Sequence, residues 1–92
     1  MAVIITKQSK PISKIKKGDK IWIHEKEMIV DDHYLFIDHK TTKEMIIEVY
    51  NPKNEKEYQI RYFDDQVESS IEVYQLENDF QYVKKDPDSI SW

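Results

Sequence analysis

Aromatic side chains next to acidic pairs form the pattern in this sequence that best fits a binding chemistry. The chain holds two Trp, six Tyr and three Phe residues among 92. Aromatic faces attract cations, and neighbouring carboxylates raise the local concentration of positive charge. The simpler alternative is that large aromatic residues fill the core of a small fold and cover its open ends. The candidate ligand-binding residues, predicted to leave the outer face of a sheet, are Trp22, Tyr34, Phe36, Phe63, Asp64 and Asp65.

The three histidines, His24, His33 and His39, fall in one region that is also rich in aspartate. Imidazole and carboxylate groups are ligands for divalent metals. No two of these histidines have the HxH or HxxxH spacing that presents two ligands on one strand face or one helix turn. The sequence therefore predicts ordinary turn and surface histidines, and no metal site.

Catalytic arrangements are not apparent in the sequence. Nucleophilic catalysis needs Ser or Thr near a histidine and a carboxylate, and no spacing links Thr41, Thr42, Ser69 or Ser70 to a histidine. Adjacent carboxylates point to opposite faces in a strand, and in a turn they bond backbone amides. The single glycine, Gly18, excludes a glycine-rich phosphate loop. We therefore expect no enzyme activity and no cofactor.

Composition limits the class of protein. Ninety-two residues suffice for one small domain, and 35% of them are charged. The absence of cysteine excludes disulfides, cysteine-ligated metals and a thiol nucleophile. No apolar run is long enough to span a membrane or to form a signal-peptide core. We expect a soluble, cytoplasmic protein that does not bind membranes.

The net charge of −4 divides unevenly along the chain. Residues 1–20 hold six lysines and one acid, for +5, whereas residues 21–92 hold eight basic and seventeen acidic residues, for −9. The basic leader could lie across the acidic surface of its own domain, contact nucleic acid, or be a solvated terminus. The acidic body repels phosphate and so disfavours duplex binding.

Alternating apolar and polar residues predict strands over most of the chain. Within residues 34–38, the alternation assigns Leu35 and Ile37 to the core and the aromatic residues to the opposite face. Residues 31–33 have the composition of a turn or bulge, and residues 51–54 (NPKN) are typical of a hairpin turn. The predicted strands are 20–24, 27–31, 34–38, 43–50, 57–63, 67–74 and 80–84.

Evidence for helix is thin. The spacing of Val67, Ile71 and Tyr74 leaves a helix over 67–76 as an alternative to the strand, against which the paired serines and β-branched residues argue. Residues 11–17 could form a turn. Close-spaced strands separated by turn residues favour a compact all-β, mainly antiparallel fold, either a small barrel or a strongly bent sheet of six or seven short strands.

Two segments resemble small SH3-like barrels, including the Tudor and KOW families. Residues 15–23 (IKKGDKIWI) are similar to the segment that enters the first barrel strand, and residues 58–65 (YQIRYFDD) followed by 71–76 resemble a Tudor-type element. The chain differs in having Asp65 and Gln66 where such barrels usually have glycine. The resemblance implies a barrel that binds peptides or nucleic acids in a groove, and an aromatic cage for a methylated basic side chain.

These observations predict a basic arm over residues 1–17, a β-barrel domain over 18–85 and a polar tail over 86–92. The function we expect is that of a non-catalytic interaction module whose acidic, aromatic-bearing surface binds a basic protein or peptide. The alternatives are single-stranded nucleic-acid binding through the leader lysines, and pairing of exposed strand edges with a larger partner. The expected core comprises Ile21, Ile23, Val30, Leu35, Ile37, Ile47, Val49, Ile60 and Val73.

Overall fold

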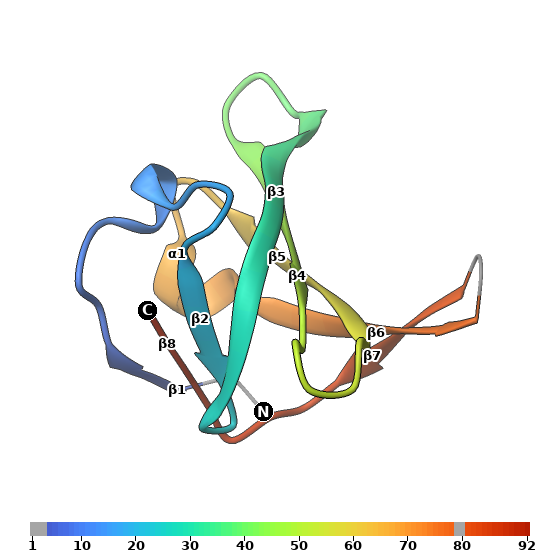
Figure 1. Cartoon of the computed structure of the whole chain (residues 1–92). Coiled ribbons are helices and arrows are strands. Elements are labelled where there is room, and N and C mark those ends of the chain that lie inside the picture. The colour runs from blue at the N-terminus through green and yellow to red at the C-terminus, as the bar shows by residue number, and fades with distance from the viewer. Residues whose placement is uncertain (1–3, 79–80) are drawn as a thin grey trace.

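The alternating segments form the strands of one curled sheet (Figure 1). The computed structural model describes residues 4–78 and 81–92. Within these residues the sheet has eight strands in the order β1-β8-β2-β3-β4-β5-β6-β7, and the β1–β8 pair is the only parallel one among them. The prediction of an all-β, mainly antiparallel, strongly bent sheet is thus confirmed. The strands are β1 (Ile4–Lys7), β2 (Lys20–Ile23), β3 (Lys26–Asp38), β4 (Lys43–Tyr50), β5 (Glu57–Phe63), β6 (Glu72–Asn78), β7 (Gln81–Lys85) and β8 (Ser89–Ser91).

Helix is limited to two short turns in the described chain, the 3-10 turn η1 (Ile12–Lys14) and α1 (Val67–Ser70). Neither has the length or the apolar character needed to cross a lipid bilayer. The strand expected over 67–74 is therefore wrong in its first five residues, because β6 begins only at Glu72 and the serines before it bond to the turn backbone and to the end of β5. The N–H of Ser70 donates to the Gln66 carbonyl at 3.0 Å, and the Ser70 hydroxyl accepts the N–H of Phe63 at 2.8 Å.

Strand β3 is one continuous strand where the sequence predicted two. Its pairing with β4 passes from Val30–Val49 to Asp32–Glu48, so Asp31 is an extra residue in a bulge. A second irregularity lies between Leu35 and Ile37, where Phe36 is the extra residue. The bulge composition of residues 31–33 is thus confirmed, and each bulge bends the strand and changes which side chains share a face.

The core lies on the inner face of the curled sheet and includes seven of the nine residues expected there. The assignment of Leu35 and Ile37 to the core is wrong, because they are 45% and 41% exposed. The β3–β4 hairpin extends beyond the curled part of the sheet (Figure 1), where no core is present to cover it. The buried core residues are Ile12, Ile15, Ile21, Ile23, Met28, Val30, Ile47, Val49, Ile60, Tyr62, Ile71, Val73, Ile90 and Trp92.

Both terminal segments contribute to this fold. Strand β1 pairs with β8, and η1 buries Ile12 within the segment expected to be a basic arm. The segment expected to be a polar tail carries β8 and buries Ile90 and Trp92. The indole Nε1 of Trp92 donates to the Lys10 carbonyl at 2.7 Å, so the two ends of the chain are bonded to each other.

The last predicted strand is present as β7. It was expected to begin at Phe80, which lies outside the described residues, and its described part is Gln81–Lys85. The turn predicted at residues 51–54 is confirmed between β4 and β5. There the carboxamide oxygen of Asn51 accepts the N–H of Lys53 at 2.8 Å, as turn-forming asparagines do.

Candidate functional site

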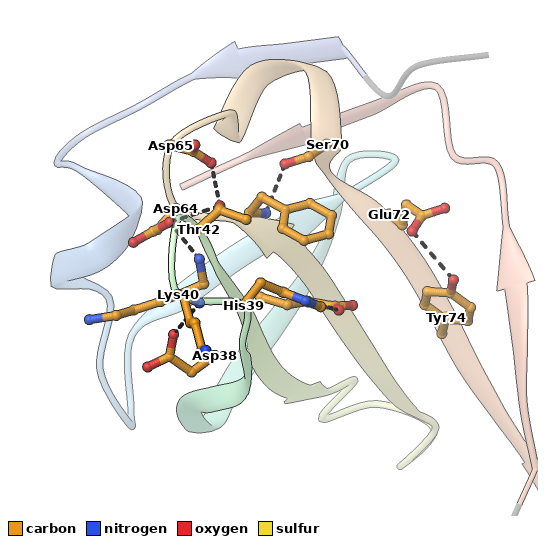
Figure 2. A network of polar contacts seen from close by, with 12 residues as sticks. Asp38, His39, Lys40, Thr42, Asp64, Asp65, Ser70, Glu72 and Tyr74 are labelled. Atoms are coloured by element: carbon orange, nitrogen blue, oxygen red, sulfur yellow. Dashed lines mark hydrogen bonds and ion pairs between the residues drawn. The ribbon is translucent and has the colours of Figure 1, made fainter.

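Three of the six candidate residues, Phe63, Asp64 and Asp65, lie where β5 ends beside the β3–β4 loop. The Lys43 N–H donates to Asp64 Oδ1 at 3.0 Å, and the Thr42 hydroxyl donates to the carboxylates of both aspartates. Figure 2 shows these bonds converging on the loop. The acidic pair therefore binds the chain's own backbone and hydroxyl groups, and it holds the hairpin against the end of β5.

The tip of the β3–β4 hairpin is held by further local contacts. The Lys40 N–H donates to Asp38 Oδ1 at 2.8 Å, and the His39 ring lies 5.8 Å from the ring of Phe63. His39 Nε2 is 3.6 Å from Glu44 Oε1, which permits an ion pair when the imidazole is protonated. These contacts give the projecting hairpin a defined position relative to β5 (Figure 2).

Phe36 and Tyr34 lie on β3, and the ring of Phe36 packs against a cationic side chain of the same protein, Arg61. The guanidinium of Arg61 on β5 lies 5.4 Å from the centroid of the Phe36 ring and 4.1 Å from that of Tyr74. Its Nε and Nη2 donate to the Gln59 Oε1 at 3.2 and 3.0 Å. A cation–π site is thus present on the outer face, and Arg61 occupies it.

Polar contacts continue from Arg61 across the outer face. The Gln59 side chain is also hydrogen-bonded to Tyr82, and Tyr34 is bonded to Glu48. Burial, and then the bond to Glu48, raises the pKa of Tyr34 to about 12. Burial also raises the pKa of the Tyr82 phenol. Both phenols therefore stay protonated near neutral pH, and the cluster is a bonded structural unit.

Trp22 does not join the other candidate residues. It lies on β2 opposite Glu27, and it lines a cleft that includes Asn51 and Pro52 of the β4–β5 turn. That turn follows the last residue of β4, whereas Asp64 contacts the first residue, Lys43. The structure thus separates Trp22 from Phe63, Asp64 and Asp65 by the length of a strand.

The residues that sequence reasoning missed are Leu35 and Ile37. With Phe36, which is 46% exposed, they form three consecutive large apolar side chains near the end of the hairpin, each more than two-fifths exposed. We call Leu35, Phe36 and Ile37 the hairpin patch. No sequence signal marked it, because the acidic, turn-like composition of residues 31–33 indicates the bulge at Asp31, whereas the bulge within the patch is at Phe36.

Acidic residues surround the hairpin patch. Residues 31–44 and 63–68, which meet through the β3–β4 and β4–β5 pairings, hold seven acidic and two basic side chains, for a formal charge of −5. Outside these ranges, the Arg61 guanidinium is a cation that contacts the patch, on the ring of Phe36. Such a surface attracts cationic partners and repels anionic ones. This end of the molecule therefore combines exposed apolar side chains with negative charge.

The leader lysines are partly engaged within the chain. Lys10 forms an ion pair with Asp19, and Lys20 with Glu27 at 3.2 Å. The C-terminal lysines that would extend a nucleic-acid surface are also paired, Lys84 with Glu72 and Lys85 with Glu77, each at 2.9 Å. These contacts reduce the positive charge that the leader and β7 offer to a phosphate backbone.

The histidines have separate environments. His33 Nδ1 lies 2.8 Å from the Ile15 carbonyl oxygen, and its Nε2 lies 2.8 Å from the Tyr62 hydroxyl. Because a carbonyl only accepts, Nδ1 carries the hydrogen, and the Nε2 of the neutral ring accepts from Tyr62. Among the described residues, no group of three or more histidine and acidic side chains is placed to hold a metal ion.

A second cleft, of about 370 Å³, lies at the opposite end of the sheet from the hairpin patch. Its lining includes the core residues Ile23, Met28 and Val73 and the β2–β3 turn residue His24. His24 and Glu25 both have positive φ angles, of 51° and 65°, and His24 Nδ1 lies 3.4 Å from Asp88 Oδ2. The pocket walls are mixed in charge and select no ligand class.

Comparison of the chain with protein-family models, curated proteins and solved structures gives no match. The likeness to SH3-like barrels therefore stays an expectation from sequence.

Proposed function

We propose that this protein is a non-catalytic interaction module that binds a basic protein segment at the hairpin patch. The single observation that carries the proposal is the exposure of Leu35, Phe36 and Ile37 within a region of formal charge −5. Isolated exposed apolar residues are common, but three consecutive ones at an acidic strand end are more than scattered exposure and are typical of interaction sites. A partner with alternating apolar and cationic side chains would complement both features.

The surrounding fold supports a binding role because it holds the patch in place. The Asp64 and Thr42 bonds fix the base of the β3–β4 loop, and Arg61 packs against the Phe36 ring. A preorganised site loses less conformational entropy when it binds. Of the candidate residues, Phe36, Phe63, Asp64 and Asp65 belong to this proposed site or its supports, Tyr34 lies beside it, and Trp22 lies apart from it.

The expected contribution of the patch follows from its exposure. Full burial of a leucine or isoleucine side chain stabilises by roughly 1.5–3 kcal/mol, so covering the remaining two-fifths contributes about 1 kcal/mol each. Replacing both Leu35 and Ile37 with serine should therefore weaken binding by about 2 kcal/mol, or roughly thirtyfold. Because more than half of each side chain is already buried in the free protein, the double variant should also lose stability, by about 1–2 kcal/mol per site, and its fold is checked by circular dichroism before the titration.

The test is a titration of the protein with a fluorescently labelled peptide of alternating lysine and leucine, followed by anisotropy. The matched control variant is Ile4→Ser, which removes an apolar side chain that is 65% exposed on β1, away from the hairpin. The matched control peptide has glutamate in place of lysine. Wild type and the Ile4 variant should bind the lysine peptide, and the double serine variant should bind it weakly.

Two results would overturn the proposal. One is equal affinity for the lysine and glutamate peptides, which would remove the role of the acidic surroundings. The other is unchanged affinity in the Leu35→Ser, Ile37→Ser variant, which would remove the role of the patch. Added salt should weaken the lysine peptide's binding only in part, because apolar contacts are insensitive to ionic screening.

A further inference from the structure

The outer half of β3 has one side that no other strand of the described chain occupies. Strand β2 pairs with β3 only from Lys26 to Ile29. Beyond it, Gly18 and Asp19 exchange backbone hydrogen bonds with Val30, each of 2.8 Å, and His33 reaches the Ile15 carbonyl through its ring. From Tyr34 to Asp38, the strand partners within the described chain all lie on β4.

This free edge of β3, residues 34–38, coincides with the hairpin patch. A strand edge presents backbone N–H and C=O groups that only solvent satisfies, and it is a template for an added strand. Leu35 pairs with Met45 and Ile37 with Glu44, which are adjacent in β4 and therefore face opposite sides of the sheet. A strand laid along this edge would find an apolar side chain on each face.

We propose that the basic segment binds by adding to the sheet as an extra strand along the free edge of β3. This inference rests on the proposed function, because it uses the same patch and the same class of partner. Main-chain hydrogen bonds to residues 34–38 would supply much of the affinity, and contacts with Leu35 and Ile37 would select apolar side chains. The acidic surroundings would select lysine or arginine at the positions between them.

The charge of this edge decides between a basic partner and a second copy of the chain. Two copies paired through β3 would bring two regions of formal charge −5 together, and like charges placed side by side repel. The bulge at Phe36 acts in the same direction, because bulges interrupt regular pairing between long edges. A short, extended and cationic segment avoids the charge repulsion, and it has to pair past only the one bulge at Phe36.

The decisive experiment changes the backbone of the peptide and leaves the protein intact. In an extended strand, successive N–H groups point to opposite edges, so alternate residues face β3. Two versions of the lysine–leucine peptide are needed, one N-methylated at even positions and the other at odd positions. They have the same charge, the same side chains and the same number of methyl groups.

Strand addition predicts that only one of the two methylated peptides loses affinity. Losing two or three main-chain hydrogen bonds should weaken its binding by at least about tenfold, while the other should bind like the parent. Amide hydrogen exchange gives a second readout: the parent peptide should slow exchange within residues 34–38, and the weakened peptide should not.

The possible failures are distinguishable. If the parent peptide binds and both methylated versions bind equally, the added strand is refuted and the proposed function stands. If the parent does not bind at all, both proposals are refuted. If sedimentation shows that the free protein self-associates, and Leu35→Ser with Ile37→Ser abolishes the association, the occupant is a second copy and the choice of a basic partner is wrong.

Discussion

Replacing Arg61 by methionine tests how much the cluster on the outer face stabilises the fold. The guanidinium lies 4.1 Å from the Tyr74 centroid and 5.4 Å from that of Phe36, and it donates twice to Gln59 Oε1. Gln59 is only 7% exposed, so its oxygen has little access to water when the guanidinium is removed. Methionine keeps an unbranched apolar stem of similar reach and removes the charge and the donors.

The expected loss of stability can be worked from these contacts. Cation–π contacts at partly exposed sites contribute about 0.5–1 kcal/mol each, and the shorter contact, with Tyr74, contributes more. Leaving the nearly buried Gln59 oxygen without its donor costs about 1–3 kcal/mol. Allowing for compensation by the methionine stem, we expect destabilisation of about 2 kcal/mol and a fall in melting temperature of roughly 10 °C.

Urea unfolding followed by circular dichroism measures this free energy directly. The matched variant Arg61→Lys keeps a cation between the rings but loses the paired donors, so its loss should be about half as large. A methionine variant whose free energy of unfolding is within about 0.5 kcal/mol of that of wild type would refute the reasoning. The Arg61 contacts would then contribute no more than ion pairs on an exposed surface do. Equal losses for lysine and methionine would assign the effect to the hydrogen bonds alone.

Three further predictions concern stability. Glu25→Gly should stabilise the fold by about 0.5–1 kcal/mol in urea unfolding, because glycine adopts the φ of 65° at this turn without steric cost. Tyr62→Phe should destabilise it by about 1 kcal/mol, since it removes the hydrogen bond to His33 Nε2 and keeps the buried ring. Hydrogen bonds from the Lys10 ammonium and the Lys16 N–H lower the pKa of Asp19 below its ordinary 3.8. The stability Asp19 contributes is therefore fully present above pH 3.8 and is lost as pH falls through its lower folded pKa. Asp19→Asn should thus be less stable than wild type at pH 7, and the difference should shrink in acid.

Each of these has a result that contradicts it. Stabilisation by Glu25→Ala as large as by Glu25→Gly would show that backbone conformation is not the cause. A Tyr62→Phe variant as stable as wild type would mean that the bond to His33 makes no net contribution. A constant difference between wild type and Asp19→Asn from pH 7 down to pH 2 would exclude the protonation of Asp19 as its source.

Much of the sheet followed from local patterns. The strands at residues 43–50 and 57–63 match β4 and β5, because apolar residues at every second position, including Met45, Ile47 and Val49, give each strand an apolar face for the core. The bulge at Asp31 and the turn at Asn51 were also marked by their residue types. The terminal strands β1 and β8 were missed, since each is three or four residues long and exists through pairing with the other end of the chain.

The site was harder to predict than the sheet. Phe63, Asp64 and Asp65 do lie together, but Asp64 and Asp65 accept bonds from the chain's own Thr42. Phe36 faces a cation, but the cation is Arg61, more than twenty residues away in sequence. No local pattern reports which side chain from another strand fills the space in front of an aromatic ring.

The sequence by itself determined the all-β class, the inner face of most strands and the charge that favours a cationic partner, because periodicity and composition are local properties. Only the tertiary structure decided that Leu35 and Ile37 are exposed. Their alternation is that of core residues, but the long β3–β4 hairpin carries both past the end of the core, and the bulge at Phe36 turns Ile37 to the face of Glu44. Burial depends on what lies across from a residue, and that is set by the arrangement of the whole sheet.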